Sequence, residues 1–356
     1  MRRKTFKRAA IGLVAALGLA ACGGGSASTD TVSMETTVAE ELPGTGMTVG
    51  LLYDITGRGD KSFNDAAAAG YDKALAEFPG ATFIESAPTG DEDRAERLQT
   101  MIDQGAGLIV CVGFLWTKDC SAGALAHPEI SFAIIDDVID SPNTVSLLFK
   151  EAEGSFLVGY AAALKSSSGK IGFIGGVRTD GIGKFEAGFK AGVVAANPDA
   201  TIEVKYVTEP PDFSGFNDPA KGKTIASAMY SSGIDVIYHA AGGTGAGLFV
   251  AAMESGKKPG EIWAIGVDSD QYQSVAAENG KDYILTSMLK RVDVATYDAI
   301  KAYLTGAPLS GTIIFDLSKD GVGYSSSNSA ISDIADKLEA VKADIVAGTI
   351  SVPEKP

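Results

Sequence analysis

The sequence contains few of the residues on which metal sites and nucleophilic enzymes most often depend. It has two histidines and three cysteines among 356 residues, too few to predict a zinc site. It is also short of positive charge, with 30 Lys and Arg against 45 Asp and Glu and a formal net charge of −15. Proteins that grip nucleic acid need clustered basic side chains, so we predict no nucleic-acid partner. We predict no cofactor either, because neither the phosphate-binding loop nor the dinucleotide fingerprint is complete.

Apolar runs long enough to cross a membrane as a helix are missing as well. The run Ala9–Ala21 follows a basic head and is too short to span a bilayer, which is typical of a secretory signal, so we predict a signal peptide at residues 1–21. Its end, Leu19-Ala20-Ala21-Cys22, resembles the lipobox of bacterial lipoproteins and predicts a lipid anchor on Cys22. The alternative is an ordinary signal with a coincidental cysteine. The small polar residues 22–46 predict a flexible tether.

The other two cysteines leave two alternatives open. In an oxidising exterior, Cys111 and Cys120 can pair and close a short loop after a predicted strand. Otherwise Cys111 is a buried free thiol and Cys120 lies in a loop. The sequence does not decide between these alternatives.

The remaining composition is that of a folded protein, with 45% apolar and 21% charged residues. From Met47 onward, strand and helix patterns alternate in two series, which predicts two parallel sheets covered by helices and therefore an α/β fold with two lobes. We assign residues 47–148 plus 271–305 to the N-terminal lobe and residues 149–270 plus 306–356 to the C-terminal lobe. The predicted strands are 48–53, 82–85, 108–112, 131–135, 170–174, 201–207, 235–239, 262–267 and 284–288. The predicted helices are 65–78, 91–104, 183–196, 220–231, 245–255, 292–304 and 330–346.

Candidate binding residues follow the strands, because ligands of open parallel sheets bind at the carboxyl ends of the strands. After the first strand, Ser62 and Asp65 are typical of a helix start. The neighbouring Phe63 either stacks on a flat ligand or begins the buried face of that helix. Two carboxylates after an apolar strand, Asp136 and Asp137, are costly there unless they cap or bind something.

The second series supplies complementary groups. A glycine run that includes Gly242 and Gly243 lets a ligand approach the main chain at a helix start. Asp268 and Lys290 follow two other strands. A carboxylate accepts hydrogen bonds and an ammonium group donates them, so the pair suits a ligand with neighbouring hydroxyls.

Two other functions have less support. An enzyme would need a general base among His127, His239 or a carboxylate, and the sequence has no nucleophile-elbow motif, so we predict that the protein is not an enzyme. The run Arg58-Gly59-Asp60 matches the adhesion tripeptide. A surface adhesin or antigen therefore remains an alternative.

Six motifs spaced along the chain resemble the basic membrane protein family, the purine-nucleoside receptor lipoproteins of ABC importers. They are Asp54–Asn64, Ile134–Asp136, Lys184–Phe189, Ala241–Gly245, Gly266–Asp270 and Thr286–Arg291. The resemblance extends over the chain from Met47 onward. It departs at Gly59, where the family commonly has Asn.

This resemblance implies a two-lobed periplasmic-binding-protein fold (type I, Venus flytrap) that closes on a nucleoside. It implies that Phe63 and Phe185 sandwich the base while Asp136 bonds its edge. Asp268 and Lys290 would hold the ribose hydroxyls. The complete set of implied ligand-binding residues is Asp54, Ser62, Phe63, Asn64, Asp136, Phe185, Gly242, Gly243, Asp268 and Lys290.

The resemblance also implies the setting of the protein. We expect a monomer, lipid-anchored through Cys22 on the extracytoplasmic face of the cell membrane. Its partners would be a nucleoside ligand, an ABC permease and a separate ATPase subunit. The same fold binding a sugar or another small polar solute is the alternative.

Overall fold

The structure is a computed structural model that describes residues 42–89 and 93–356. These residues belong to one compact unit. The predicted signal peptide (1–21), Cys22 and all of the predicted tether before residue 42 lie outside the described residues. Within the described ranges, no helix combines the length and the apolar character needed to cross a membrane.

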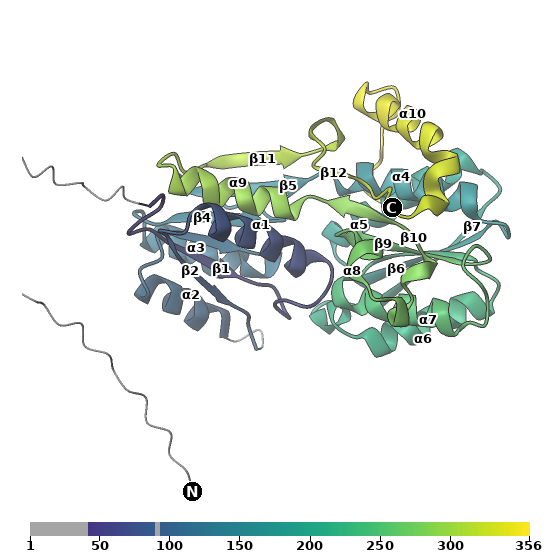
Figure 1. Ribbon diagram of the computed structural model, residues 1–356, viewed down its shortest axis with the longest axis horizontal. Helices are drawn as coiled ribbons and strands as arrows, with labels where there is room; N and C mark the ends of the chain where they lie inside the picture. The colour runs from purple at the N-terminus through teal and green to yellow at the C-terminus, as the bar shows by residue number, and fades with distance from the viewer. Residues whose placement is uncertain (1–41, 90–92) are drawn as a thin grey trace, which may run out of the picture. The chain divides into compact units, whose positions relative to one another are not determined.

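The described strands form two six-stranded sheets with the same strand order (Figure 1). The first sheet has the order β11-β5-β4-β3-β1-β2, and every neighbouring pair is parallel. The second has the order β12-β10-β9-β8-β6-β7, in which only β12 runs antiparallel. The predicted α/β fold class is confirmed. The strands are β1 (Thr48–Leu52), β2 (Thr82–Ser86), β3 (Leu108–Cys111), β4 (Ser131–Ile135), β5 (Thr144–Phe149), β6 (Lys170–Val177), β7 (Thr201–Thr208), β8 (Val236–Ala240), β9 (Trp263–Asp268), β10 (Ile284–Lys290), β11 (Gly311–Phe315) and β12 (Val322–Tyr324).

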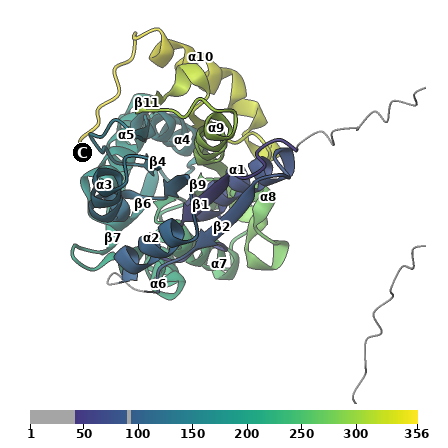
Figure 2. The same ribbon diagram turned by 90° about the vertical axis from the view of Figure 1, so that its left-hand side faces the viewer.

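Helices cover both faces of each sheet. On the first sheet, α1 packs beside α9 on one face and α2 beside α3 on the other (Figure 2). On the second, α4 packs with α5 on one face and α6 with α7 on the other. The helices are α1 (Phe63–Glu77), α2 (Arg94–Asp103), α3 (Thr117–Ala126), α4 (Glu151–Lys165), α5 (Asp180–Ala196), α6 (Pro219–Ser231), α7 (Ala246–Glu254), α8 (Gln271–Ser274), α9 (Val292–Leu304) and α10 (Ala335–Val346). Three short 3-10 helices also matter here: η2 (Phe114–Trp116), η3 (Phe213–Phe216) and η4 (Gly242–Gly245).

The alternation of side chains along the strands explains these two faces. In β3, Leu108 and Val110 contribute to the core beneath α1 and α9, whereas Ile109 and Cys111 contribute to the core beneath α2 and α3. All four side chains are buried, as expected for a parallel strand covered on both sides. The apolar runs that predicted strands in the sequence therefore also fix the helix layers.

The chain passes between the two sheets at three places in the described residues. After β5 of the first sheet it enters α4, which packs against β10 of the second; after β10 it enters α9, which packs against α1; and β11 leads to β12. The sequence placed 271–305 in the N-terminal lobe and 306–356 in the C-terminal lobe, but β10 pairs with β9 and β11 pairs with β5. Periodicity identifies a strand and not its partner, so the sequence could not show that the predicted strand 284–288 pairs with β9, and it predicted no strand at Gly311–Phe315. The lobe limits as a whole stay a prediction.

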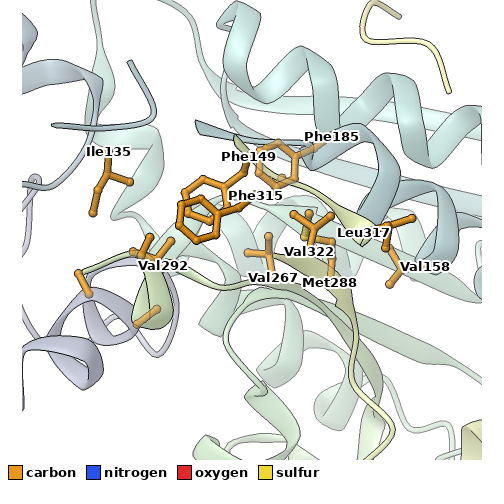
Figure 3. Close-up of a cluster of buried hydrophobic side chains, with 14 of the residues drawn as sticks. Ile135, Phe149, Val158, Phe185, Val267, Met288, Val292, Phe315, Leu317 and Val322 are labelled. Carbon is orange, nitrogen blue, oxygen red and sulfur yellow. The ribbon is translucent and has the colours of Figure 1, made fainter. Parts of the chain in front are cut away.

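The apolar core is continuous where the chain crosses between the sheets. Phe149 ends β5 and Phe315 ends β11, and their rings stack with centroids 5.1 Å apart. Figure 3 shows this pair between Ile135 of the first sheet and Met288 and Val322 of the second. The crossings are therefore packed segments and join the two sheets without a loose linker.

Candidate functional site

A cavity of about 390 Å³ lies beside the carboxyl ends of strands from both sheets. This volume is within the range of small-molecule sites, roughly 300–1,000 Å³. Asp54 and Gly113 follow β1 and β3 of the first sheet, while Asp268 and Lys290 end β9 and β10 of the second, and all four line the cavity. Its position is the one expected for the ligand site of an open parallel sheet.

Most of the residues predicted to bind ligand meet in this cavity. Those that line it are Asp54, Phe63, Asn64, Asp136, Phe185, Gly242, Asp268 and Lys290. Of the other two predicted residues, Ser62 and Gly243 are not among the lining residues, although both are described and buried. Gly59 does not line the cavity either.

Ser62 has a different role from the helix cap that its position suggests. It occupies the N-cap position of α1 but makes no side-chain cap hydrogen bond. The carboxylate of Asp60 instead accepts from the main-chain N–H groups of Ser62, Asn64 and Asp65. The Ser62 hydroxyl donates to Asp268 Oδ2 at 2.5 Å, and so it links the first half of the chain to the second.

Two more hydrogen bonds connect the same segments. Ser269 Oγ donates to the carbonyl oxygen of Ser62 at 3.0 Å, and Gln271 Nε2 donates to the carbonyl oxygen of Lys61 at 3.0 Å. Gln271 is 1% exposed, which strengthens a hydrogen bond that solvent cannot replace. The loop before α1 is therefore fastened to the turn after β9, directly beside the cavity.

Lys290 is the central cation of the site. Its ammonium group bonds Asp136 and lies 3.8 Å from Glu151, and the side chain is only 3% exposed. It also lies 4.9 Å from the ring centroids of Phe63 and Phe149. Burial lowers the pKa of Lys290, but the surrounding carboxylates outweigh burial and raise that pKa above its usual value. Lys290 therefore remains charged and can donate to a ligand.

Two of the aspartates have an unusual backbone conformation. Asp136, after β4, has φ +69°, and Asp268, at the end of β9, has φ +64°. A side-chain-bearing residue rarely adopts this left-handed region, and Asp is one of the few that tolerates it. Such conformations concentrate at binding and catalytic sites. Here they occur at equivalent positions of the two sheets and direct both carboxylates to the cavity.

Several buried carboxylate oxygens in this part of the described chain have no hydrogen-bond partner: Asp54 Oδ1, Asp136 Oδ1 and Glu151 Oε2. Burial raises the pKa of Asp54 to about 7, against a weaker opposing effect from Arg94 at 3.8 Å. Burial likewise raises the pKa of Asp268 to about 6. Arg94 and Lys184 lie near Asp54 Oδ1 and Glu151 Oε2 but donate no hydrogen bond to them, so these oxygens are acceptors that suit the N–H and O–H groups of a ligand.

The aromatic side chains around the cavity differ in exposure. Phe63 and Phe216 are half-buried and line the cavity from different halves of the chain, Phe63 from α1 and Phe216 from η3. Phe185 also lines it but is 5% exposed and belongs to the core. Sequence reasoning missed Phe114 and Phe216, which lie in short 3-10 helices without a periodic pattern. It missed Glu151 because the strand before it, β5, was not predicted.

The charge of the cavity limits what it can hold. Its lining contains seven carboxylates and two ammonium groups, those of Lys184 and Lys290. Both lysines lie near carboxylates, with Lys184 Nζ 3.6 Å from Glu151 Oε2. No group of His, Cys, Asp and Glu with the arrangement of a metal site occurs among the described residues. The site thus favours an uncharged or cationic polar ligand over a phosphorylated one.

The tripeptide Arg58-Gly59-Asp60 is engaged inside the molecule. The Arg58 guanidinium pairs with Asp72 at 2.7 Å and with Glu85 at 2.8 Å. The Asp60 carboxylate caps α1. Since both charged side chains are already bonded, this observation does not favour an adhesion function.

Comparisons with known proteins agree with this geometry. The family described as "ABC transporter substrate-binding protein PnrA-like" matches residues 47–356. A Listeria innocua serovar 6a protein named "CD4+ T-cell-stimulating antigen" is 39% identical over 373 residues, covering 100% of both chains. A Lactococcus lactis subsp. cremoris protein named "ABC transporter nucleoside-binding protein BmpA" is 34% identical over 369 residues, again covering 100% of both.

The fold has solved counterparts. An ABC transporter solute-binding protein from Aeropyrum pernix K1 is 29% identical with a TM-score of 0.75, covering 86% of this chain and 94% of that one. The predicted resemblance and the periplasmic-binding-protein fold are confirmed, and members of the family act outside the cytoplasm. The chain belongs to the PnrA-like (basic membrane protein) family of ABC transporter substrate-binding proteins.

Proposed function

We propose that the protein captures a nucleoside in this cavity and delivers it, chemically unchanged, to the permease of an ABC importer powered by a separate ATPase subunit. The observation that carries this proposal is a cavity with aromatic side chains, buried carboxylates and the buried ammonium group of Lys290. A nucleobase has two apolar faces and a polar edge, and its ribose carries neighbouring hydroxyls. The Lactococcus lactis relative is named a nucleoside-binding protein, and this name supports the same ligand class.

We assign the roles from the lining of the cavity. Phe63 stacks on one face of the base, and we assign the opposite face to Phe216, which is half-buried and lines the cavity from the other half of the chain, because Phe185 is mostly buried in the core. Phe185 forms the cavity wall near Lys290. The Lys290 ammonium group lies 5.7 Å from the centroid of the Phe185 ring.

The polar groups divide between base and sugar. Asp54 Oδ1 and Asp136 Oδ1, which accept no hydrogen bond within the protein, accept from the base edge, with Asn64 beside them. Asp268 and Lys290 hold the ribose hydroxyls, with the main chain at Gly242 adjacent. Ser62 and Gly243 do not line the cavity, and we assign them a supporting role behind its wall.

The setting is also part of the proposal. A signal peptide at residues 1–21 and a lipid on Cys22 would hold a monomer on the extracytoplasmic face of the cell membrane. Ligand contacts with both halves would favour a closed form over an open one. The permease would recognise the closed form.

Calorimetric titration of the lipid-free protein with adenosine, guanosine, inosine, uridine and ribose tests the ligand class. We expect micromolar or tighter binding of at least one nucleoside and much weaker binding of ribose. Binding of ribose alone would support the sugar alternative, and binding of none would contradict the proposal. Chromatography of the recovered ligand tests the absence of turnover, because an enzyme would release free base.

Phenylalanine variants test the stacking pair. Stacking on a base contributes about 1–3 kcal/mol, so we expect Phe63→Ala and Phe216→Ala each to raise the Kd about tenfold or more. Phe185→Ala is the matched control, and it should lower the melting temperature with a smaller effect on Kd, because its side chain is buried in the core. A large loss of affinity with Phe185→Ala alone would restore the sandwich of Phe63 with Phe185.

A further inference from the structure

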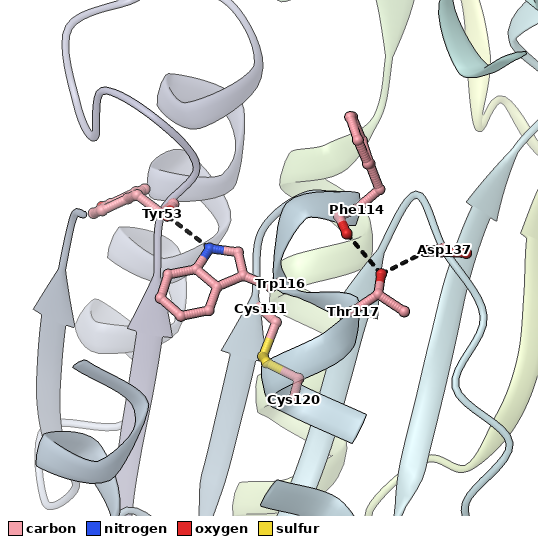
Figure 4. The surroundings of a disulfide bond; sticks show 7 residues. All are labelled: Tyr53, Cys111, Phe114, Trp116, Thr117, Cys120 and Asp137. Carbon is pink, nitrogen blue, oxygen red and sulfur yellow. Dashed lines mark hydrogen bonds between the residues drawn. A yellow bond between two sulfur atoms is a disulfide. The ribbon is translucent and has the colours of Figure 1, made fainter. Parts of the chain in front are cut away.

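The loop between β3 and α3 is closed by a covalent bond. Cys111, the last residue of β3, and Cys120 in α3 form a disulfide, and neither side chain is exposed (Figure 4). This pairing is the first of the two alternatives that the sequence left open. We call residues 111–120 the cross-linked loop. A bond that closes so short a loop restricts the conformations available to it.

The first half of the cross-linked loop touches the proposed ligand residues directly. A Cβ on Gly113 would lie 2.9 Å from Asp54 Oδ2 and 3.3 Å from Phe63 Cε1, so the main chain packs against both side chains. Gly113 has φ +99°, a conformation that favours glycine. Phe114, the next residue, lines the cavity itself.

The second half of the loop holds two other segments of the cavity wall. Trp116 is fully buried and donates from Nε1 to the carbonyl oxygen of Tyr53 at 2.8 Å, directly before Asp54 (Figure 4). The Thr117 hydroxyl lies 2.5 Å from Asp137 Oδ2 and 2.7 Å from the carbonyl oxygen of Phe114. Asp137 follows β4 and lines the cavity. One closed loop therefore contacts the ends of β1, β3 and β4.

We propose that the cross-linked loop positions the first-sheet half of the ligand site, with Trp116 and Thr117 as positioning residues and the disulfide keeping the loop ordered before the ligand arrives. The inference rests on the proposed nucleoside function. Trp116 acts through the segment of Asp54 and Thr117 acts through Asp137, while the main chain at Gly113 packs against Asp54 and Phe63. Without the disulfide, the loop would have to be ordered during binding, and that entropy would be subtracted from the affinity.

The main test removes the bond. The variant Cys111→Ala/Cys120→Ala should raise the Kd for the best-bound nucleoside of the panel about tenfold, chiefly through a less favourable binding entropy. The control Leu338→Ala removes a fully buried side chain of α10, so it destabilises the protein without touching the loop. Its Kd should equal that of the wild type. Equal Kd values for the disulfide variant and the wild type would overturn the inference.

A smaller change keeps the test independent of the disulfide's effect on folding. Thr117→Val removes the hydroxyl that bonds Asp137, and Thr117→Ser restores it. We expect a severalfold higher Kd for the Val variant and recovery with Ser. Failure of Ser to restore binding, with both variants folded, would indicate a packing role for Thr117 and would contradict the positioning role.

Hydrogen exchange of the ligand-free protein separates this inference from the proposed function. In the disulfide variant, amide exchange should accelerate at residues 53–54 and 113–117 and remain unchanged in the second sheet. The outcome does not require a bound nucleoside. Unchanged exchange would overturn the inference, whereas a wild type that binds no nucleoside would contradict only the proposed function.

Discussion

The two sheets have the same strand order but unequal chemistry. Asp136 after β4 and Asp268 at the end of β9 occupy equivalent places, and both have left-handed backbone. The lysines after the next strands differ: Lys290 ends β10 and is buried in the cavity, whereas Lys150 follows β5 and pairs at the surface with Glu354 at 2.6 Å. Equal topology thus supplies equivalent positions, and the side chains decide which half contributes the cation.

The loops after β3 and β8 show a second contrast. Each has a positive-φ glycine as its second residue, Gly113 or Gly242, and each contains a 3-10 helix. The first is closed by the disulfide. The second is held by Thr244, whose hydroxyl donates to the carbonyl oxygen of Gly215 at 2.7 Å. The same loop position is therefore rigidified by a covalent bond in one half and by a buried hydrogen bond in the other.

Replacing Lys290 or Lys150 with methionine should show the largest difference between the two halves. Lys290→Met leaves Asp136, Glu151 and Asp268 without their shared cation. Leaving a buried charge unpaired costs about 3–5 kcal/mol of unfolding free energy, and we also expect nucleoside binding to be lost. Lys150→Met is the matched control and should cost about 0–1 kcal/mol, because its ion pair is at the surface.

Urea unfolding and calorimetry measure both effects. Similar losses for the two variants would mean that the buried position of Lys290 carries no special role. Retention of full affinity by the Lys290→Met variant would remove it from the proposed ribose contacts.

Much of this comparison could be predicted from the sequence. Apolar runs followed by Asp136, Asp268 or Lys290 indicated strands with polar ends, and the topology of parallel sheets brings such ends to one edge. The loop after the first strand added Phe63, and the family motifs added Asp54. These residues are next to strong local patterns, which is why they were found.

What the sequence did not reveal depends on contacts between distant segments. The hydroxyl of Ser62 is bonded to Asp268 and not to its own helix because Asp60 already caps that helix. The partner sheets of β10 and β11 are set by the crossings, which leave no periodic signal. Phe216 reaches the cavity from a 3-10 helix whose position depends on the packing of both halves.

The pH dependence of stability sharpens the contrast between the two halves. Burial raises the pKa of Asp54 in the first half from 3.8 to about 7. The folded state therefore holds a proton that the unfolded state releases between these values. This contribution to stability is complete below pH 3.8 and is lost as the pH rises through 7.

Asp54→Asn should remove this dependence. Relative to the wild type, the variant should gain stability on going from pH 4 to pH 8, by at most about 4 kcal/mol in urea unfolding. Asp268→Asn should show a smaller gain that is complete nearer pH 6, because burial raises the pKa of Asp268 to about 6. If the difference in unfolding free energy between each variant and the wild type does not vary with pH, neither carboxyl group accounts for the pH dependence of stability.

The smallest expected effect is at Gly59, where the family commonly has Asn. Gly59 is exposed, has φ +114°, and a Cβ there would meet no atom within 4 Å. Gly59→Asn should therefore cost about 1 kcal/mol of unfolding free energy through backbone strain and change the Kd for a nucleoside less than about twofold. Urea unfolding and calorimetry are the measurements. A tenfold gain in affinity would mean that this loop reaches the bound ligand and that Gly59 leaves the first half without a polar contact that Asn would make.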